Sequence, residues 1–336
     1  MPQTYAEAGV RIDEGERFVR LIKKPVRSTF TRRVLGDLGG FGALFDARFK
    51  GYRNPVLVSS VDGVGTKLKV AQLVGRHDTV GQDLVNHCVN DILTLGAKPL
   101  FFLDYFATGK LRAELAAEVV SGFVRACKEN RCALVGGETA EMPGFYDGEE
   151  YDLAGTIVGV AEKKELITGG KIRKGDVLVG LASTGLHTNG YSLARSVLLR
   201  RYQVDDYIDD LGKTVGEALL AVHRSYLRTV TAVRKKFSIH GISHITGGGI
   251  EGNTNRIVPR GLRLRVDWSA WERPVLFRLI QRLGEIPEED ARRAFNLGVG
   301  MILIVSRKNV DRMVRFLHKQ GEQAMIVGEV VGGRKG

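Results

Sequence analysis

The feature that most constrains the fold is the heptapeptide Val61–Lys67, which reads Val-Asp-Gly-Val-Gly-Thr-Lys. It follows Pro55–Ser60, a run rich in β-branched residues that predicts a buried strand. A carboxylate, Asp62, therefore stands where a strand ends, and the two glycines after it let a ligand approach the backbone closely. Asp can hold Mg²⁺, while glycine-rich backbone, Thr and Lys can hold phosphate oxygens. The stretch is consistent with a nucleotide site, although its spacing is not that of a Walker A loop and an Asp-Gly pair also suits an ordinary turn.

Length and composition indicate a soluble globular protein of two domains. The 336 residues are enough for two cores, and 42 glycines with only 8 prolines indicate many tight turns. Cys88, Cys127 and Cys132 have no metal-type spacing, which favours a reduced, cytoplasmic setting. The N-terminal segment is too polar for a signal peptide, and the longest apolar run, Leu297–Val305, is too short to span a membrane.

The net charge of +12 suits phosphorylated small molecules and also permits nucleic-acid binding. The basic residues are scattered, and no cluster is interleaved with the stacking aromatics that a single-strand binder needs. We therefore expect no nucleic-acid partner.

A second carboxylate is expected on the helix Val80–Leu95. Asp83, His87 and Asp91 recur every four residues and share one face of that helix. An acid near a helix C-terminus is opposed by the helix dipole unless a cation compensates, so Asp91 indicates a metal position. For His87 a packed or hydrogen-bonded role is the more ordinary expectation.

Two further strands carry acids near their ends. Asp104 interrupts the strand Pro99–Ala107, and the short strand Cys132–Val135 runs into a glycine-rich segment that contains Glu138. A buried carboxylate needs a partner or a metal, so Asp62, Asp104 and Glu138 could converge with Asp91 on one cation. The alternative is a set of separate turns. The glycine loop Gly39–Gly42 suits closure over a ligand.

The order of elements predicts an α+β fold with helices on one face of a sheet. The other face would stay apolar, and homodimerisation through the sheet would cover it. The polar stretch Glu162–Gly175 predicts a boundary that divides the chain into domains 1–165 and 166–336.

The second domain is expected to be a mixed α/β sheet domain. The strand Val177–Leu181 leads into a segment with hydroxyls, His187 and a helix N-terminus, which suits an anion or phosphate. His187 could transfer protons, or it could simply cap the helix that follows. The stretch Thr214–Phe237 is predicted as one long helix.

Taken together, these segments resemble the family of phosphoribosylformylglycinamidine cyclo-ligase, also called aminoimidazole ribonucleotide synthetase. The matching segments run in order along the whole chain: Tyr5–Ile12, Gly39–Leu44, Asp62–Lys67, Asp83–Asp91, Phe101–Leu111, Gly136–Gly144, His187–Leu193, Ile245–Gly249 and Phe295–Met301. Asp-Gly-Val-Gly-Thr-Lys occurs in a wider superfamily of ATP-using enzymes, whereas Phe102–Leu111 and Gly137–Gly144 resemble the cyclo-ligase specifically. Arg11, His87 and Thr188 depart from the family's usual residues.

The resemblance implies a reaction and a fold. ATP would activate the formyl amide oxygen of formylglycinamidine ribonucleotide as an iminophosphate, and an amidine nitrogen would close the imidazole ring. The products would be aminoimidazole ribonucleotide, ADP and phosphate, with Mg²⁺ on the nucleotide. The fold would be two-domain and aminoimidazole-ribonucleotide-synthetase-like, with N-terminal domains of a homodimer pairing into an intersubunit β-barrel.

The same resemblance implies the site residues. Asp62 and Asp91, with Glu138 as a further candidate, would hold the metal, and His187, Lys67 and Asp62 would be catalytic. His187, Thr188 and Asn189 would face the substrate. The ATP site would comprise Lys23, Gly39, Gly40, Phe41, Gly42, Asp62, Gly63, Thr66, Lys67, Asp91, Gly137, Glu138 and Thr139. The alternative is another enzyme of the superfamily, a small-molecule kinase or a selenophosphate-type synthetase.

Overall fold

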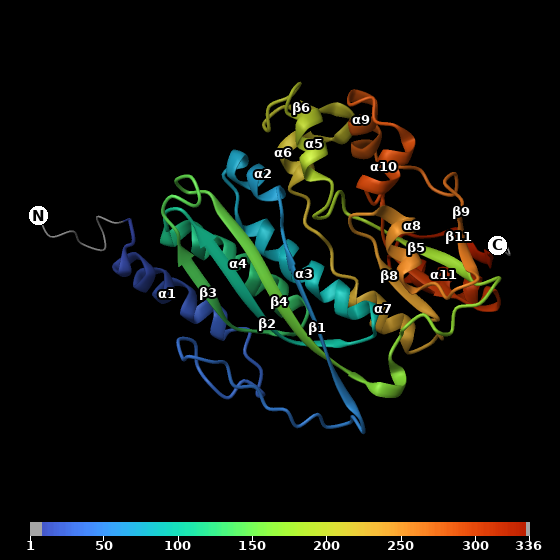
Figure 1. The fold of residues 1–336 in the computed structure, drawn as a ribbon, viewed down its shortest axis with the longest axis horizontal. Coiled ribbons are helices and arrows are strands. Elements are labelled where there is room, and N and C mark those ends of the chain that lie inside the picture. The colour runs from blue at the N-terminus through green and yellow to red at the C-terminus, as the bar shows by residue number, and fades with distance from the viewer. Residues whose placement is uncertain (1–8, 334–336) are drawn as a thin grey trace, which may run out of the picture. The chain divides into compact units, whose positions relative to one another are not determined.

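The computed structural model describes residues 9–333, and the chain divides into two compact units. Unit 1 runs up to Ile92 and includes Lys98–Lys163, whereas unit 2 comprises Leu93–Ala97 and the chain from Lys164 onward. Figure 1 labels the elements, and each unit is treated separately below. The first part of the Tyr5–Ile12 motif lies outside the described residues.

In its described part, unit 1 is built on a sheet with the strand order β1-β4-β2-β3. The strands are β1 (Pro55–Gly63), β2 (Lys98–Thr108), β3 (Ala133–Glu141) and β4 (Tyr151–Glu162). β4 runs antiparallel to both of its neighbours, and β2 and β3 are parallel. The helices are α1 (Ile12–Arg27), α2 (Lys67–Val74), α3 (Asp78–Thr94) and α4 (Ala113–Glu129).

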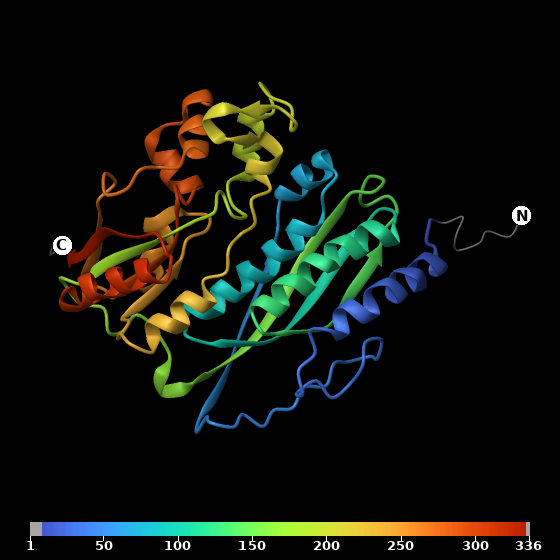
Figure 2. The same ribbon diagram turned by 180° about the vertical axis from the view of Figure 1, so that it is seen from behind.

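The helices cover one face of this sheet, as the sequence predicted. Seen from behind in Figure 2, α4 lies across the sheet with α1 beside it. Phe102 of β2 packs against Phe123 of α4, and both side chains are fully buried. α3 and α4 approach closely because each contributes a glycine: a Cβ on Gly81 would lie 2.3 Å from the Val119 carbonyl oxygen, and one on Gly122 would lie 2.2 Å from that of Asp78.

The opposite face of the sheet carries exposed apolar side chains. Side chains on a strand alternate between its two faces. On β1, Val58 is buried, whereas Leu57 and Val61 keep 61% and 66% of their surface exposed. Tyr105 of β2 is exposed as well. This is the face that was expected to pair with a second copy.

β3 is longer than expected. The sequence predicted a strand over Cys132–Val135 followed by a glycine loop, but β3 continues through Glu141. The reason is pairing: Leu103–Thr108 of β2 runs in register with Gly136–Glu141 and supplies backbone partners to the glycine segment.

Unit 2 contains an antiparallel sheet with the strand order β8-β10-β5-β11-β9 among the described residues. These strands are β5 (Val177–Ala182), β8 (Gly241–His244), β9 (Leu262–Val266), β10 (Val299–Val305) and β11 (Ala324–Gly332), and a short ribbon pairs β6 (Tyr207–Ile208) with β7 (Lys213–Thr214). The helices are α5 (Tyr191–Leu198), α6 (Val215–Leu219), α7 (Leu227–Arg234), α8 (Gly249–Thr254), α9 (Val275–Leu283), α10 (Glu288–Ala294) and α11 (Val310–Lys319).

Both faces of this sheet are packed. Val179, Leu303 and Met313 belong to one apolar cluster, and Leu178 and Ile302 belong to another. Neighbouring residues of β5 and β10 thus fall into different clusters, as the alternation of a strand requires. This explains why these strands are almost continuously apolar in the sequence.

The prediction of one long helix over Thr214–Phe237 was wrong. α6 begins with a capping box between Thr214 and Glu217 and ends at Leu219, and helix resumes only at Leu227. A tertiary contact holds the intervening segment: the Thr184 hydroxyl donates to the Val222 carbonyl oxygen across 2.5 Å. This contact satisfies a backbone carbonyl oxygen that a continuous helix would have satisfied internally.

Between residues 9 and 333, no helix is both long and apolar enough to cross a membrane.

Candidate functional site

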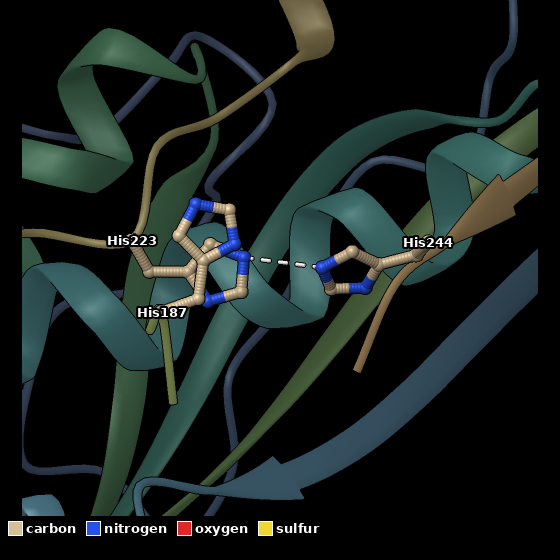
Figure 3. Close-up of side chains that lie close together, drawn as sticks. All are labelled: His187, His223 and His244. Atoms are coloured by element: carbon tan, nitrogen blue, oxygen red, sulfur yellow. Dashed lines mark hydrogen bonds between the residues drawn. The ribbon is translucent and has the colours of Figure 1, made fainter. Parts of the chain in front are cut away.

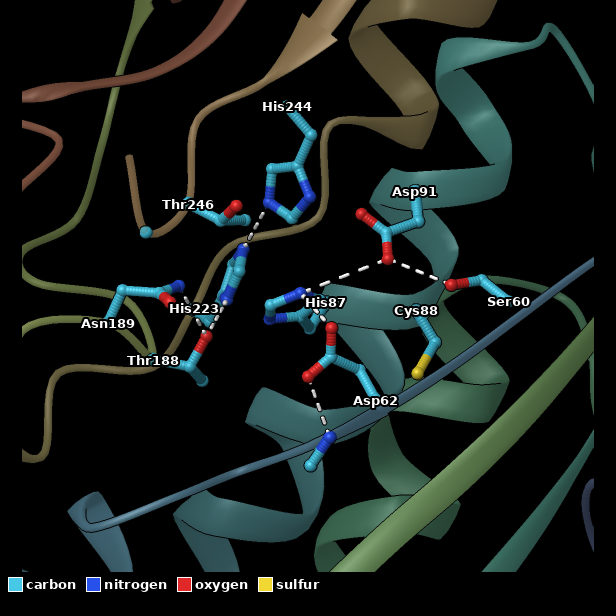
Figure 4. A network of polar contacts seen from close by, with 12 residues as sticks. Ser60, Asp62, His87, Cys88, Asp91, Thr188, Asn189, His223, His244 and Thr246 are labelled. Carbon is cyan, nitrogen blue, oxygen red and sulfur yellow. Dashed lines mark hydrogen bonds and ion pairs between the residues drawn. The ribbon is translucent and has the colours of Figure 1, made fainter. Parts of the chain in front are cut away.

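Two predicted metal ligands of unit 1, Asp62 and Asp91, lie beside one imidazole (Figure 4). Nε2 of His87 is 2.9 Å from Asp62 Oδ2 and 3.9 Å from Asp91 Oδ2. The Ser60 hydroxyl donates to Asp91 Oδ2 across 2.9 Å, and the Gly63 N–H donates to Asp62 Oδ1 across 2.7 Å. β1 and α3 therefore bring the two carboxylates together at the predicted strand end.

The charges in this cluster support one another. Burial is the largest influence on His87 and lowers its pKa, but the hydrogen bond to Asp62 and the charges of Asp91, Asp62 and Asp83 raise it above its ordinary value. Burial likewise raises the pKa of Asp62, yet His87 and the Gly63 N–H lower it overall. The two shifts agree in sign: the contact favours the ionised form of Asp62 and the protonated form of His87.

This cluster can accept a divalent cation. Asp62 and Asp91 keep 41% and 29% of their side-chain surface exposed, whereas His87 keeps 5%. Two carboxylates and the hydroxyl of Ser60 form the oxygen set that Mg²⁺ prefers. The donor chemistry thus fits the predicted metal. The raised pKa of His87 also shows that the surrounding carboxylates stabilise positive charge at this position.

Lys67 does not present its ammonium group to solvent. Its Nζ lies 2.8 Å from Asp83 Oδ2, and both side chains are 0% exposed. Burial lowers the pKa of Lys67, and the neighbouring Asp83 carboxylate opposes that shift. The Lys67 ammonium group is directed at Asp83, and its contact with phosphate oxygens stays a prediction. Thr66, the N-cap residue of α2, is exposed beside it.

Among the other predicted nucleotide residues, those of the glycine loop and of the Gly137–Thr139 segment line a cavity of about 610 Å³ in unit 1. Its walls are the loop Asp37–Ala43, α1 and the β3 segment Val135–Thr139, which contains Gly137 and Glu138. Phe41 is fully exposed at the loop. Lys23 is not part of the wall, but its Nζ lies 3.8 Å from Oδ2 of Asp37, which is. The glycine loop and the Glu138 segment therefore meet at one site.

Asp104 stands in the wall of this cavity with an unusual charge state. Although part of its surface reaches the cavity, its carboxyl lies among packed atoms, and burial raises its pKa to about 7. A Cβ on Gly137 would lie 2.3 Å from the Asp104 carbonyl oxygen, so only glycine fits opposite it. The glycine thus permits the close approach of β2 and β3 at this position.

The structure does not bring Glu138 to Asp62 and Asp91 within one chain. Asp62 is aligned with Gly155, Gly155 with Asp104, and Asp104 with Gly137, the neighbour of Glu138. Three strand spacings separate β1 from β3, which amounts to about 14 Å. The expected convergence of all these carboxylates on one cation therefore needs correction: Asp62 and Asp91 share a cluster, while Asp104 and Glu138 line a separate cavity.

In unit 2, the predicted substrate residues follow β5 and precede α5. His187 has a positive φ of 61°, and its Nε2 accepts a hydrogen bond from the Thr184 N–H across 3.2 Å. The Asn189 amide donates to the Thr188 hydroxyl oxygen across 3.4 Å. The three residues are therefore adjacent in space as well as in sequence.

Two histidines that the sequence did not single out join this segment (Figure 3). The His223 ring stacks on His187, with ring centroids 4.0 Å apart and planes 13° from parallel. His223 Nδ1 lies 3.3 Å from Thr188 Oγ1, and its Nε2 lies 3.1 Å from His244 Nε2. His223 falls inside the stretch predicted as a continuous helix, so no local signal marked it.

The fold is similar to that of several solved structures, and family models assign it to the AIR synthase related class. A thiamine-monophosphate kinase from Stenotrophomonas maltophilia K279a matches with a TM-score of 0.71 at 16% identity, over 93% of this chain and 94% of that chain. E. coli HypE, a hydrogenase maturation protein, matches with a TM-score of 0.68 at 18% identity, over 94% and 91%. A model described as the AIR synthase related protein N-terminal domain covers residues 47–161, and the corresponding C-terminal domain covers residues 173–336.

Other proteins share a much higher sequence identity with this chain than these solved structures do. A phosphoribosylformylglycinamidine cyclo-ligase of Alkaliphilus metalliredigens is 50% identical, over 100% of this chain and 97% of the relative. One of Pseudothermotoga lettingae is 51% identical, over 99% and 98%. The chain belongs to the phosphoribosylformylglycinamidine cyclo-ligase family, as the motifs predicted.

Proposed function

We propose that this protein uses ATP to close the imidazole ring of formylglycinamidine ribonucleotide, giving aminoimidazole ribonucleotide, ADP and phosphate in purine biosynthesis. The observation that carries the proposal is the clustering of Asp62 and Asp91 in a chain 50% identical, from end to end, to a relative named for this reaction. Such a biosynthetic enzyme is expected to work in the cytoplasm.

The chemistry requires charge stabilisation more than covalent help. An amide oxygen leaves poorly until it is phosphorylated, and phosphoryl transfer depends on positioned cations and backbone donors. Mg²⁺, when bound, would neutralise the charge that develops on the transferred phosphoryl group. Asp62 and Asp91 would hold that ion, and the exposed residues Gly65 and Thr66 would face the phosphates.

The cavity beside the glycine loop would take the rest of the nucleotide. Gly39–Gly42 would cover it, Gly137 and Thr139 would line it, and Lys23, which lies close to Asp37 of the wall, would add positive charge nearby. Asp104, neutral up to a pH of about 7, could donate a hydrogen bond there. Glu138 could assist the metal only if a second copy of the chain brings it near Asp62.

For Lys67 we propose a positioning role in place of the predicted direct contact. Its pair with Asp83 joins the start of α2 to α3, the helix that carries His87 and Asp91. The pair would thereby fix Thr66 relative to the carboxylate cluster.

In the second domain, taken as residues 166–336, His187, Thr188 and Asn189 would face the substrate and His187 would move protons. The close contacts among His187, Thr188 and His223 support a preorganised polar segment. His187→Ala should lower turnover more than it weakens ATP binding. If the variant had normal turnover at saturating ATP and only weaker ATP binding, the assignment of His187 to the substrate would be wrong.

The first domain, residues 1–165, would dimerise through the open face of its sheet. Leu57, Val61 and Tyr105 expose apolar surface there, and a second copy would bury it in an intersubunit barrel. Val61→Asp should shift the sedimentation of the protein from dimer to monomer. An unchanged dimer would contradict this surface.

The decisive assay supplies the purified protein with formylglycinamidine ribonucleotide, ATP and Mg²⁺. We expect one aminoimidazole product for each ADP and phosphate formed. Thiamine monophosphate should not be phosphorylated, although the fold resembles a kinase of that compound. Phosphorylation of thiamine monophosphate without ring closure would favour the alternative, a small-molecule kinase of the same superfamily.

A further inference from the structure

Three buried imidazoles from distant segments of unit 2 lie together. His187 follows β5, His223 lies between α6 and α7, and His244 ends β8. They retain 1%, 0% and 5% of their surface, and one ring nitrogen from each lies within 4.8 Å of those of the other two. Figure 3 shows the three rings facing one another.

The contact between His223 and His244 has nearly the nitrogen–nitrogen separation of two ligands on one ion. Their Nε2 atoms are 3.1 Å apart. Two imidazole nitrogens on a tetrahedral Zn²⁺, at bond lengths of about 2.0–2.1 Å, lie about 3.3–3.4 Å apart. The separation would have to grow by only a few tenths of an ångström, and the two rings would have to turn so that both nitrogens point at the ion that replaces the proton.

His223 also has the outer contact that metal-binding histidines show. Its Nδ1 lies 3.3 Å from Thr188 Oγ1, so the Nδ1–H can donate to that hydroxyl and leave Nε2 for an ion. His187 differs, since its Nε2 accepts from the Thr184 N–H and its proton therefore lies on Nδ1. To bind an ion through Nδ1, the ring must move that proton to Nε2 and give up the Thr184 hydrogen bond. Because it stacks on His223, the His187 ring must tilt to aim Nδ1 at the same ion.

We propose that His187, His223 and His244 form a binding site for a divalent transition metal of the Zn²⁺ class. Imidazole nitrogen suits Zn²⁺, Ni²⁺ or Cu²⁺, whereas Mg²⁺ prefers oxygen. The site is thus chemically distinct from the carboxylate cluster of unit 1. It goes beyond the proposed function, and an ion bound here would compete with the proton transfer proposed for His187.

Metal binding tests this inference without any assay of turnover. The full chain is freed of metal with a chelator, kept in excess Mg²⁺ and titrated with Zn²⁺ by calorimetry and with Co²⁺ by visible absorption. We expect one equivalent of Zn²⁺ and the absorption bands of tetrahedral Co²⁺. Saturation with Mg²⁺ should not block either ion.

Single substitutions then identify the ligands. Changing an outer contact of a metal site costs about 10–100-fold in affinity, so loss of a ligand in His223→Gln or His244→Gln should cost about 100-fold or more. The matched control is His318→Gln, an imidazole on α11 that hydrogen-bonds to the Ala324 carbonyl oxygen, and it should bind as the unmodified chain does.

Two results would overturn the site. One is the absence of Co²⁺ bands and of Zn²⁺ heat with the unmodified chain, which would leave a shared proton as the account of the His223–His244 contact. The other is unchanged Zn²⁺ affinity in both folded variants. Circular dichroism establishes folding, and if neither variant folds, the Co²⁺ spectrum of the unmodified chain decides by itself.

Discussion

Asp62 and Asp104 occupy the same row of one sheet, on either side of Gly155, and yet their pKa values are shifted in opposite directions. The pKa of Asp62 lies below its ordinary value because His87 and the Gly63 N–H outweigh its burial. The pKa of Asp104 rises to about 7 because burial dominates. The neighbouring groups, not the place in the strand, decide which carboxyl is ionised.

This difference separates two kinds of chemistry within one domain. The ionised Asp62, with Asp91 close by, suits a cation, whereas the neutral Asp104 suits a hydrogen-bond donor in the cavity. Carboxyls whose environments push their pKa values apart commonly divide acid and base roles between them. The following predictions test that division, from the largest expected effect to the smallest.

The strongest test concerns a third aspartate, Asp83, which has a buried cation as its partner. Lys67→Met removes that cation and should lower the free energy of unfolding by about 3–5 kcal/mol, the typical cost of breaking a buried pair. Urea unfolding followed by circular dichroism measures it. Lys69→Met, on the same helix but in a half-exposed pair with Glu150, should cost less than about 1 kcal/mol. Equal effects of the two changes would contradict the assigned pair.

Asp104 should make the stability of the protein fall as pH rises. Its pKa is about 7 in the folded chain and near 3.8 when unfolded, so both states are protonated below pH 3.8. Between these values only the unfolded state ionises, and the loss is complete above pH 7, at about 4 kcal/mol at most. Asp104→Asn should remove this loss, measured by urea unfolding at pH 5 and pH 8 without nucleotide. If the variant and the unmodified protein differed in the free energy of unfolding by the same amount at both pH values, Asp104 would have to be ionised in the folded protein already at pH 5.

Asp62→Asn and Asp91→Asn should each lower turnover at least about 100-fold with folding intact, which corresponds to roughly 2.7 kcal/mol in the barrier. Steady-state assays at saturating ATP measure the change. Asp147→Asn, an exposed carboxylate of the same domain, is the control and should have normal turnover. A fully active double variant at Asp62 and Asp91 would refute the metal assignment.

The smallest expected effect is the coupling between the two regions. If Glu138 acts apart from Asp62, the losses of Mg²⁺-ATP affinity in Asp62→Asn and Glu138→Gln should add within about 0.5 kcal/mol. Calorimetric titration of the single and double variants gives the coupling energy. A coupling of about 1 kcal/mol or more would mean that the two carboxylates meet, which the separation within one chain allows only through a partner copy.

Much of the fold was predictable because its signals are local. β2 extends the predicted strand Pro99–Ala107 by one residue at each end, and β5 extends the predicted strand Val177–Leu181 by one residue. Alternation and helical periodicity depend on neighbours a few positions away, so they are readable in the sequence. The end of β3 and the break after Leu219 were missed, because pairing with β2 and contacts such as Thr184 to Val222 come from distant segments.

The sequence by itself determined the family, the element types and the chemistry available at each strand end. Only the tertiary structure decided which side chains meet: it joined Asp62 to Asp91 through His87, buried Lys67 against Asp83, kept Glu138 apart and gathered three histidines. The physical reason is that charge state and ligand geometry depend on burial and on neighbours brought close by folding, and neither is encoded in local spacing.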